Sequence, residues 1–384
     1  MNREKQILLN EKRLKQKPKK FPIKIPKLKN IINKKRKAKS SKEIKSPKIF
    51  NIIIASATLI ILFLSLILII RKSFLITKYN INHYKNKIPI AFALNANYVY
   101  PIIVTLTSIL YNSSPDTFYI FYLLLNPDIK ESHINKILGI KEKYPNCKIE
   151  LIKMGEKYSD YPEGFNKSAS IYYRLELSEL ISDFDKIIYL DGDTIVHKDL
   201  TDMYNINMGK YYYMGFPDHD IVYYDFEGKR NFINSGVLLI NLKDLREINA
   251  TKKFKDYYDE YGTLKVDEYL INAVFYGNIS FLPFIYGIPD FGAGSPTTVS
   301  ISNFISEFGQ YVNWSLTDME KYSKNRAITH MCYENDKWWE KNYTNLTEIG
   351  KQWLFYASKS NIFDDICKKY HQFESQCEKI KNEN

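Results

Sequence analysis

The chain has 384 residues, of which 45% are hydrophobic and 26% are charged. This composition excludes a wholly disordered protein, and the length allows one large domain or two modest ones. The formal net charge of +12 belongs to the start of the chain: residues 1–48 carry nineteen Lys and Arg against three acids, so the remaining residues sum to −4. The body therefore lacks the basic character typical of nucleic-acid binding, and no nucleic-acid partner is expected.

Residues 49–70 form an uncharged and mainly apolar stretch. As a helix it would extend about 33 Å, enough to cross a hydrocarbon core of about 30 Å. A secretory signal peptide has a shorter apolar region and a shorter basic start. A buried core helix is the alternative, which the lack of a polar face disfavours. We therefore expect a basic cytosolic tail (1–48), a transmembrane helix (49–70) and a stem (71–87).

The charges around this span predict its orientation. The basic tail precedes it, whereas only Arg71, Lys72 and Lys78 follow closely, so the positive-inside rule places the N-terminus in the cytosol. This is the layout of a single-pass type II membrane protein. The run Lys34–Lys37 also fits a nuclear-import or nucleic-acid patch, but beside a span, contact with anionic headgroups is the simpler interpretation.

Beyond the stem the chain alternates strand-like and helix-like segments. Expected strands lie at 88–94, 118–125, 148–152 and 186–190, and expected helices at 99–110, 129–143 and 168–181. Asn97 is the expected N-cap of the first helix, with Pro101 in its first turn. This order predicts an α/β, Rossmann-like fold with a mostly parallel central sheet.

No GxGxxG or GxxxxGK[ST] loop follows the first strand, which disfavours an NAD enzyme or a P-loop NTPase.

From Lys351 the composition is helical and ends in a charged segment, 374–384, expected to fray. The four cysteines form no CxxC pair, and although Cys367 and Cys377 are near enough to bridge, their connectivity stays open.

Asp191 and Asp193 directly follow the apolar strand 186–190. Open α/β sheets bind ligands beyond the carboxyl ends of their strands. In an extended segment, residues two apart point the same way, so both carboxylates would face one ion, and Gly192 would let the backbone approach closely. Hard oxygen ligands suit Mn²⁺ or Mg²⁺. The alternative is a solvated acidic turn.

Several segments together resemble the retaining glycosyltransferases of family 8, the relatives of glycogenin and of lipopolysaccharide galactosyltransferases. They are Ser168–Arg174 with Asp185–Asp193, Phe232–Leu242, Asp267–Glu268 opening a helix, and Ile328–His330 followed by Lys337-Trp-Trp339. The resemblance covers roughly residues 87–339. It implies a GT-A nucleotide-diphospho-sugar transferase domain, which we place at 88–345, followed by a helical tail at 346–384.

The resemblance also implies roles for individual residues. Asp191, Asp193 and His330 would hold Mn²⁺ on the donor diphosphate, and Lys337 would add a positive charge there. Asn95, Asn97 and Tyr98 would hold the nucleoside, and Arg174 would approach the donor sugar and phosphate. The sugar hydroxyls would be bound by Asp218, Asn234, Ser235, Asp267 and Glu268.

The sequence departs from the family pattern in three places. Asn95 and Glu268 stand where the family usually has Asp and Gln. The loop from His330 to Lys337 has Tyr333 in place of a glycine and one extra residue, so we expect the loop that carries Lys337 to have a different shape. Because adjacent helical residues project about 100° apart, Asp267 and Glu268 are not expected to form a facing pair.

The expected activity is therefore metal-dependent, retaining transfer of a hexose, glucose or galactose, from a UDP-sugar to a glycan, glycolipid or glycoprotein. Front-face attack assisted by the leaving phosphate is favoured over a covalent adduct on Glu268. One alternative is a membrane-tethered, non-catalytic carbohydrate-binding protein. Another is a haloacid-dehalogenase-type phosphatase, which also uses an acidic pair after a strand. A Golgi or other secretory-pathway membrane is the expected location, with a bacterial inner membrane as the alternative.

Overall fold

The computed structural model describes part of the chain. The described residues are 56, 58–67, 83–161, 168–217, 232–261, 266–287, 317, 321, 325–331, 337 and 347–383. They fall into two units, Met1–Ser73 and Phe74–Asn384, each described by itself below.

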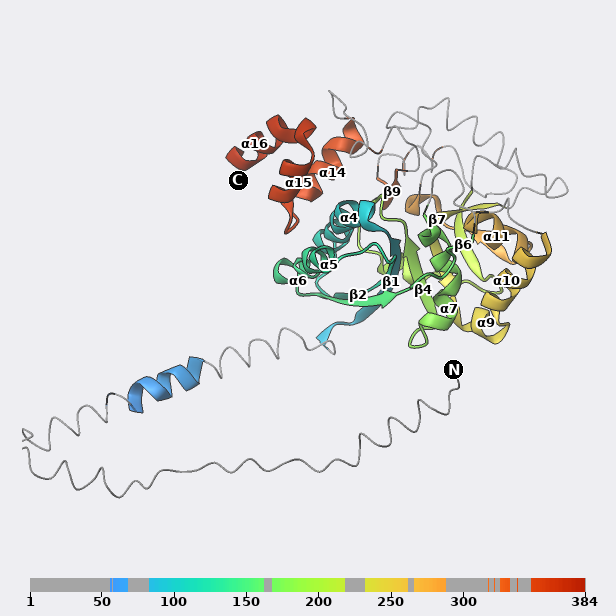
Figure 1. The fold of residues 1–384 in the computed structure, drawn as a ribbon, viewed down its shortest axis with the longest axis horizontal. Helices are drawn as coiled ribbons and strands as arrows, with labels where there is room; N and C mark the ends of the chain where they lie inside the picture. The colour runs from blue at the N-terminus through green and yellow to red at the C-terminus, as the bar shows by residue number, and fades with distance from the viewer. Residues whose placement is uncertain are drawn as a thin grey trace, which may run out of the picture. The chain divides into compact units, whose positions relative to one another are not determined.

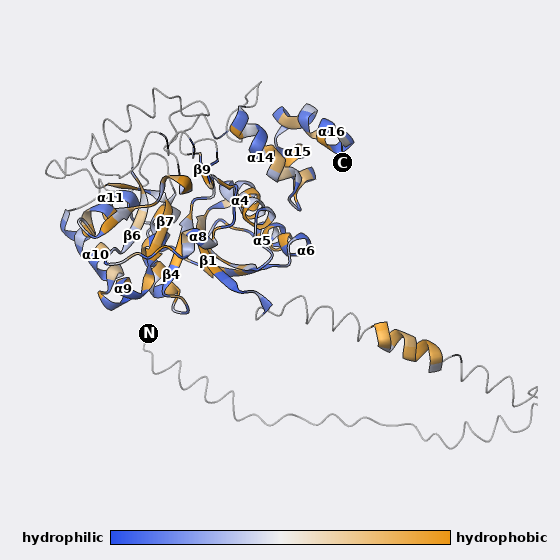
Figure 2. Ribbon diagram, turned by 180° about the vertical axis from the view of Figure 1, so that it is seen from behind, coloured by the Kyte–Doolittle hydropathy of each residue, from blue (hydrophilic) through white to orange (hydrophobic). Residues whose placement is uncertain are grey.

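In the first unit, residues 58–67 form a helix whose large apolar side chains, Leu59 and Phe63 among them, are exposed. Figure 2 shows this helix as a hydrophobic segment. Within the described residues, no helix has the length and apolarity that a membrane crossing requires. Half of the predicted span at 49–70 lies outside those residues, so the span stays a prediction.

The second unit is built on a sheet of seven described strands in the order β3-β2-β1-β4-β7-β6-β8 (Figure 1). The strands are β1 (Asn86–Leu94), β2 (Thr117–Leu125), β3 (Cys147–Lys153), β4 (Lys186–Leu190), β6 (Tyr213–Pro217), β7 (Ile233–Asn241) and β8 (Ile279–Phe281). Parallel pairing joins β3, β2, β1 and β4, whereas β7 runs antiparallel to both β4 and β6. The prediction of a mostly parallel sheet is confirmed.

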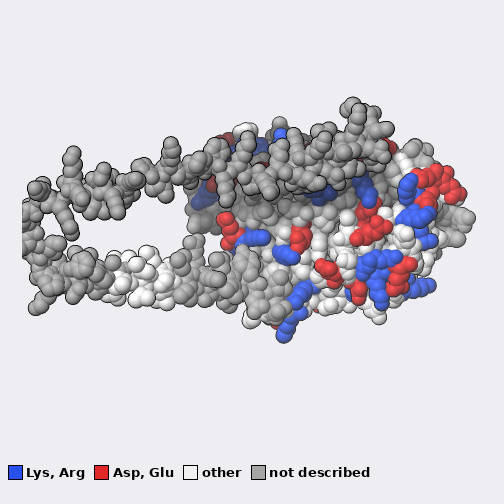
Figure 3. All heavy atoms as spheres, turned by 60° about the horizontal axis from the view of Figure 1, so that its bottom comes forward, with Lys and Arg blue, Asp and Glu red and all other residues white. Residues whose placement is uncertain are grey.

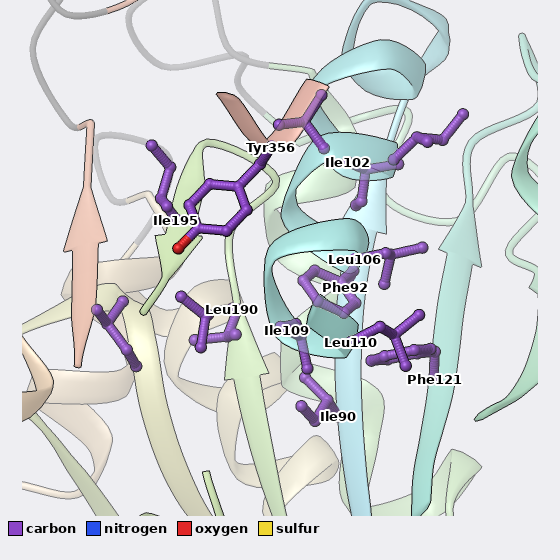
Figure 4. Packing of buried hydrophobic residues seen from close by; sticks show 14 of the residues in the cluster. Ile90, Phe92, Ile102, Leu106, Ile109, Leu110, Phe121, Leu190, Ile195 and Tyr356 are labelled. Atoms are coloured by element: carbon purple, nitrogen blue, oxygen red, sulfur yellow. The ribbon is translucent and has the colours of Figure 1, made fainter. Parts of the chain in front are cut away.

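Helical segments cover both faces of this sheet. On one face, α4 (Val99–Tyr111) packs on β1 and β2 in a core that includes Phe92, Leu106 and Phe121 (Figure 4). The other face is covered by η4 (Ala169–Glu176), α7 (Leu177–Leu180), α9 (Leu242–Glu247), α10 (Ala250–Tyr261) and α11 (Asp267–Val274). Coverage of both faces explains why β4, Lys-Ile-Ile-Tyr-Leu, is almost wholly apolar.

The C-terminal region is helical, as predicted, and its buried side chains belong to the core that contains α4. It contains α14 (Glu348–Ser358), α15 (Phe363–Lys369), η8 (His371–Phe373) and α16 (Glu374–Glu383). Trp353 and Phe373 are buried in the same cluster as α4. The expected frayed end is wrong, because α16 is helical and a Cys367–Cys377 disulfide fastens it to α15.

The shorter elements complete the second unit. They are η2 (Ala96–Tyr98), α5 (Glu131–Leu138), α6 (Ile140–Lys143), α8 (Thr201–Tyr204), η6 (Phe284–Tyr286) and a two-stranded sheet of β5 (Thr194–Val196) and β9 (Ile328–His330).

On the face drawn in Figure 3, acidic and basic side chains of the described residues are interspersed, and neither sign dominates.

Three local predictions need correction. The helix expected at 168–181 is the 3₁₀ helix η4 followed by one turn of α-helix, α7. The helix expected at 129–143 divides at Gly139 into α5 and α6. Asn97 is not the N-cap of α4: Asn95 caps the preceding turn η2 by accepting a hydrogen bond from Asn97 N, and Tyr98 occupies the N-cap of α4, where its side chain makes no capping hydrogen bond to the helix. Pro101 does lie in the first turn.

Candidate metal and nucleotide-sugar site

The acidic pair lies in a tight turn between β4 and β5. Thr105 of α4 fixes that turn, since its hydroxyl lies 2.7 Å from Thr194 O and 3.0 Å from Gly192 O. Asp191 N donates a hydrogen bond of 2.8 Å to Gly236 O on β7. A Cβ at Gly192 would lie 3.2 Å from Tyr98 Cδ1, so a glycine allows the turn to pack against Tyr98. The expected extended conformation is replaced by this turn, yet both carboxylates still reach the same place.

The third candidate ligand arrives on β9. Because β9 pairs with β5 and sets Thr194 opposite His330, the imidazole is carried to the acidic turn. His330 Nε2 lies 3.3 Å from Asp193 Oδ1 and 3.7 Å from Asp191 Oδ2. One ligand atom from each of the three residues lies within 4.8 Å of the others.

This geometry suits a divalent ion. Neighbouring ligands of an ion with bonds of about 2.1 Å lie roughly 3 Å apart, close to the distances between these atoms. Asp193 is 4% exposed, and its Oδ1 accepts no hydrogen bond from the described residues, which leaves it a lone pair for a cation. Two carboxylates and an imidazole match the donor set that Mn²⁺ accepts.

Gly236 keeps the space among these ligands open. A Cβ at this position would lie 2.1 Å from His330 Cε1 and 2.7 Å from Asp191 Oδ2. Any larger residue would displace the ligands themselves. The glycine of the Asn-Ser-Gly segment is therefore a steric requirement of the site.

Lys337 reaches the site despite its altered loop. Its Nζ lies 2.9 Å from Asp193 Oδ2 and donates a hydrogen bond of 3.1 Å to the hydroxyl of Tyr98. Burial disfavours the Lys337 ammonium, but the charge of Asp193 outweighs this and raises the lysine pKa. Burial likewise disfavours the Asp193 carboxylate, but Lys337 and His330 outweigh it and hold the Asp193 pKa below its usual range. Both groups are therefore charged at neutral pH.

Arg174 lies beneath the turn rather than in the open site. It is 4% exposed, and its guanidinium contacts Asp191 Oδ1 at 2.9 Å, Asp267 Oδ2 at 3.1 Å and the carbonyl oxygen of Ser235. The ring of Tyr189 lies 4.3 Å from the guanidinium carbon, and the Tyr189 hydroxyl donates to Asp191 Oδ1 at 3.0 Å. Arg174 thus positions two acids from buried space, and its predicted approach to the donor sugar and phosphate stays a prediction.

Asp267 and Glu268 face different partners, as expected of adjacent helical residues. Asp267 pairs with Arg174. Glu268 Oε2 accepts hydrogen bonds from Asn234 Nδ2 at 3.1 Å and from Ser235 N at 3.0 Å. Asn272, one turn later on α11, bonds the backbone of Ile233 through both ends of its amide. α11 is thereby fixed to β7.

The remaining predicted residues lie at the edge of the site or outside the described chain. Asn95 and Asn97 flank Tyr98 at the carboxyl end of β1, where Asn95 is half-buried and Asn97 exposed. Asp218 lies outside the described residues. Sequence reasoning missed Tyr189, Gly236 and Asn272, although the position of Tyr189 two residues before Asp191 on a strand was a usable signal.

Comparison with known proteins identifies the family of this chain. Residues 89–343 match the family model of glycosyl transferase family 8. A putative glycosyltransferase of Haemophilus influenzae is 26% identical over 276 residues, covering 66% of this chain and 74% of the relative. The lipopolysaccharide 1,2-glucosyltransferase of Escherichia coli is 25% identical over 284 residues, covering 70% and 75%.

Solved structures share the fold. The galactosyltransferase LgtC in complex with donor and acceptor sugar analogs aligns with a TM-score of 0.56 at 23% identity, covering 71% of this chain and 96% of that one. The bifunctional glycosyltransferase WbbM aligns with a TM-score of 0.56 at 16% identity, covering 75% and 52%. These alignments support an α/β, GT-A-like fold, and the family match overturns the phosphatase alternative. Since that match spans well over half of the sequence, the chain belongs to glycosyl transferase family 8.

Proposed function

We propose that this protein is a metal-dependent, retaining glycosyltransferase that moves a hexose, glucose or galactose, from a UDP-sugar to a glycan, glycolipid or glycoprotein acceptor. The observation that carries the proposal is the convergence of Asp191, Asp193 and His330 around the space that Gly236 leaves open. Two similar proteins, a glucosyltransferase and a galactosyltransferase, transfer hexoses, which supports a hexose donor.

The chain's residues divide the work of binding the donor. Asp191, Asp193 and His330 would hold Mn²⁺ or Mg²⁺, which, when bound, offsets the charge that develops on the departing nucleoside diphosphate. Lys337 places a second positive charge beside Asp193, on the same side as Tyr98. Tyr98, with Asn95 and Asn97, would contact the nucleoside of the donor.

The acids of α11 would act on the sugar side. Asn234 and Ser235 hold the carboxylate of Glu268 against β7, which lowers its value as a free nucleophile. Front-face attack assisted by the leaving phosphate is consistent with that arrangement. Trapping a glycosyl adduct on Glu268 would overturn this part of the proposal.

The deciding experiment measures UDP release from a panel of UDP-sugars with and without Mn²⁺. Asp193→Asn is expected to reduce turnover about a hundredfold or more, because it weakens a metal ligand at the point of charge development. Asp202→Asn, an exposed acid on α8, is the matched control and is expected to retain activity. Nucleotide-sugar binding without turnover to any acceptor, water included, would favour the non-catalytic alternative.

We also propose that residues 49–70 anchor the protein as a single-pass type II membrane protein of the secretory pathway. The uncharged run and its basic leader support this. Alkaline carbonate extraction of membranes from expressing cells should leave the full chain in the pellet and release a chain lacking residues 1–70. Release of the full chain would contradict the anchor.

A further inference from the structure

A second cavity, of about 420 Å³, lies between η4 and α10, and none of its lining residues belongs to the candidate metal site. Its size is within the range of about 300–1,000 Å³ typical of small-molecule sites. Leu175, Phe254 and Leu270 form apolar walls, and Tyr158 and Tyr161 add two aromatic rings.

A buried acid lines this cavity. Glu176 is 2% exposed, accepts a hydrogen bond from the Tyr158 hydroxyl and lies 2.5 Å from Lys157 Nζ. Tyr158 has a φ of 68°, in the left-handed region where an aromatic residue is uncommon. Strained backbone and buried charge gather at functional sites, and the transfer reaction proposed above uses neither of these residues.

The aromatic side chains of this cavity are fixed by one another. Tyr161 stacks on Tyr258 with ring centroids 3.7 Å apart and an interplanar angle of 10°. Tyr158 stacks on Tyr172 at 5.5 Å. Since these rings are already ordered, a ligand that packs against them pays little entropy for ordering the wall.

The charges of the lining indicate a neutral ligand. The cavity is lined by three lysines, Lys157, Lys252 and Lys255, and the Nζ atom of each lies 2.5 Å from a carboxylate oxygen. It is also lined by three acids, Glu176, Glu179 and Asp259. The lining therefore has no net charge that would favour an ion. Asn249 and Thr251 add neutral polar groups beside the apolar walls.

We propose that this cavity is a second saccharide site, which holds a neutral hexose unit of the acceptor or product glycan apart from the reacting unit. A pyranose ring offers an apolar face to the tyrosines and hydroxyls to Glu176, Asn249 and Thr251. The identification of the ligand as a saccharide rests on the proposed function. The position of the cavity beside the candidate metal site does not, because Leu175 follows Arg174 on η4 and Leu270 lies three residues after Asp267 on α11. The same two elements thus serve both sites.

The test titrates the full chain with lactose and with maltotriose, without donor or metal, and observes leucine methyl resonances. The resonances of Leu175 and Leu270 are expected to shift, whereas those of Leu94 and Leu110 stay unchanged. Tyr161→Ala is expected to weaken binding about tenfold, because an aromatic contact is lost. Tyr261→Ala, an exposed tyrosine of α10 outside the cavity lining, is the matched control.

The outcomes separate this site from the transfer reaction. Asp193→Asn is expected to bind both saccharides as the wild type does, so an inactive protein still tests the cavity. Unshifted Leu175 and Leu270 resonances in the wild type would overturn the proposal, whether or not the protein turns over a UDP-sugar. So would shifts produced by octanoate but by neither saccharide, because the cavity would then take an aliphatic chain.

Discussion

The two oxygens of Asp191 have different partners. Oδ1 accepts from Arg174 and from Tyr189, whereas Oδ2 faces His330. The first pair of contacts fixes the carboxylate and leaves Oδ2 for a metal ion. Groups that orient a ligand from behind typically change metal affinity about 10–100-fold when they are removed.

Tyr189→Phe is therefore expected to weaken Mn²⁺ binding about tenfold, because the hydroxyl that orients Asp191 is lost. Electron paramagnetic resonance of free Mn²⁺ during a titration measures this without turnover. Tyr213→Phe, another fully buried tyrosine of the sheet, is the control for removing a buried hydroxyl. Equal affinity in both variants and the wild type would show that Tyr189 does not orient the ligand.

Gly236→Ala tests the steric requirement of the same site. The added methyl would lie 2.1 Å from His330 Cε1, so the imidazole must move out of position. We expect loss of measurable Mn²⁺ binding and of turnover while the circular dichroism spectrum is retained. Gly155→Ala strains the backbone at φ of 61° but places no atom within 4 Å of the added carbon, so it controls for destabilisation without a contact at the site. Unchanged Mn²⁺ affinity in Gly236→Ala would contradict the ligand geometry.

The sequence predicted the candidate metal ligands but not the roles of several neighbours. Asp191, Asp193 and His330 stand in recognisable motifs, and the structure brings them together. The approach of Arg174 to the donor was expected from the family resemblance alone. Its side chain, on the 3₁₀ helix η4, is buried. Such a difference depends on packing and not on local pattern.

At the scale of elements, the β5–β9 pair carries both sides of the metal site. His197 follows β5 directly and its Nε2 lies 2.9 Å from Thr329 Oγ1 on β9. Burial lowers the pKa of His197 to about 4, and Arg326 and Lys198 act in the same direction. A histidine in the unfolded chain titrates near 6.5. Between these values the unfolded chain binds a proton that the folded chain does not.

The free energy of unfolding is therefore expected to fall as the pH drops from about 6.5 to about 4, with His197 contributing on the order of 2–3 kcal/mol to the loss. Above pH 6.5 the imidazole is neutral in both states and contributes no slope. Urea unfolding across this window measures the effect. His197→Gln, which stays neutral, should show a shallower decline; an unchanged decline would assign the effect to other groups.

The C-terminal elements are joined by the Cys367–Cys377 disulfide across a separation of ten residues. A loop of this size is expected to stabilise the folded chain by about 2–3 kcal/mol through the unfolded state. Replacing both cysteines by serine should lower the midpoint of denaturant unfolding accordingly. Reductant should have the same effect on the wild type and none on the double variant. An effect of reductant on the double variant would point to a disulfide between the two remaining cysteines, Cys147 and Cys332.

The positions and the parallel pairing of the four expected strands were well predicted. The four expected strands are observed with bounds shifted by no more than two residues, because apolar runs between turn residues mark strands clearly. The antiparallel direction of β7 carries no such local signal, since it depends on how a long connection returns to the sheet. The division at Gly139 was visible as a glycine in a helical pattern.

At the scale of the whole molecule, the metal ligands come from two distant parts of the chain. Only the folded state brings His330 to Asp191 and Asp193, so a metal ion that needs all three binds the native state alone. Such binding stabilises by mass action, about 2.7 kcal/mol at a free concentration one hundred times the dissociation constant.

Mn²⁺ is therefore expected to raise the melting temperature by several degrees, increasingly with concentration. Calorimetry of the wild type and of Asp193→Asn at rising Mn²⁺ measures it, and the variant should show little change. A rise of equal size in both proteins would place the stabilising ion elsewhere. Ca²⁺ provides a second comparison, because an imidazole ligand suits it poorly.

The pairing of β9 with β5 also orders events during synthesis. A growing chain exposes Asp191 and Asp193 long before His330 has left the ribosome, and the acidic turn lacks its third ligand throughout that interval. The chain is therefore translated almost to its C-terminal helices before the three candidate ligands can meet. A nascent fragment that ends before β9 would carry the acidic motif without the chemistry.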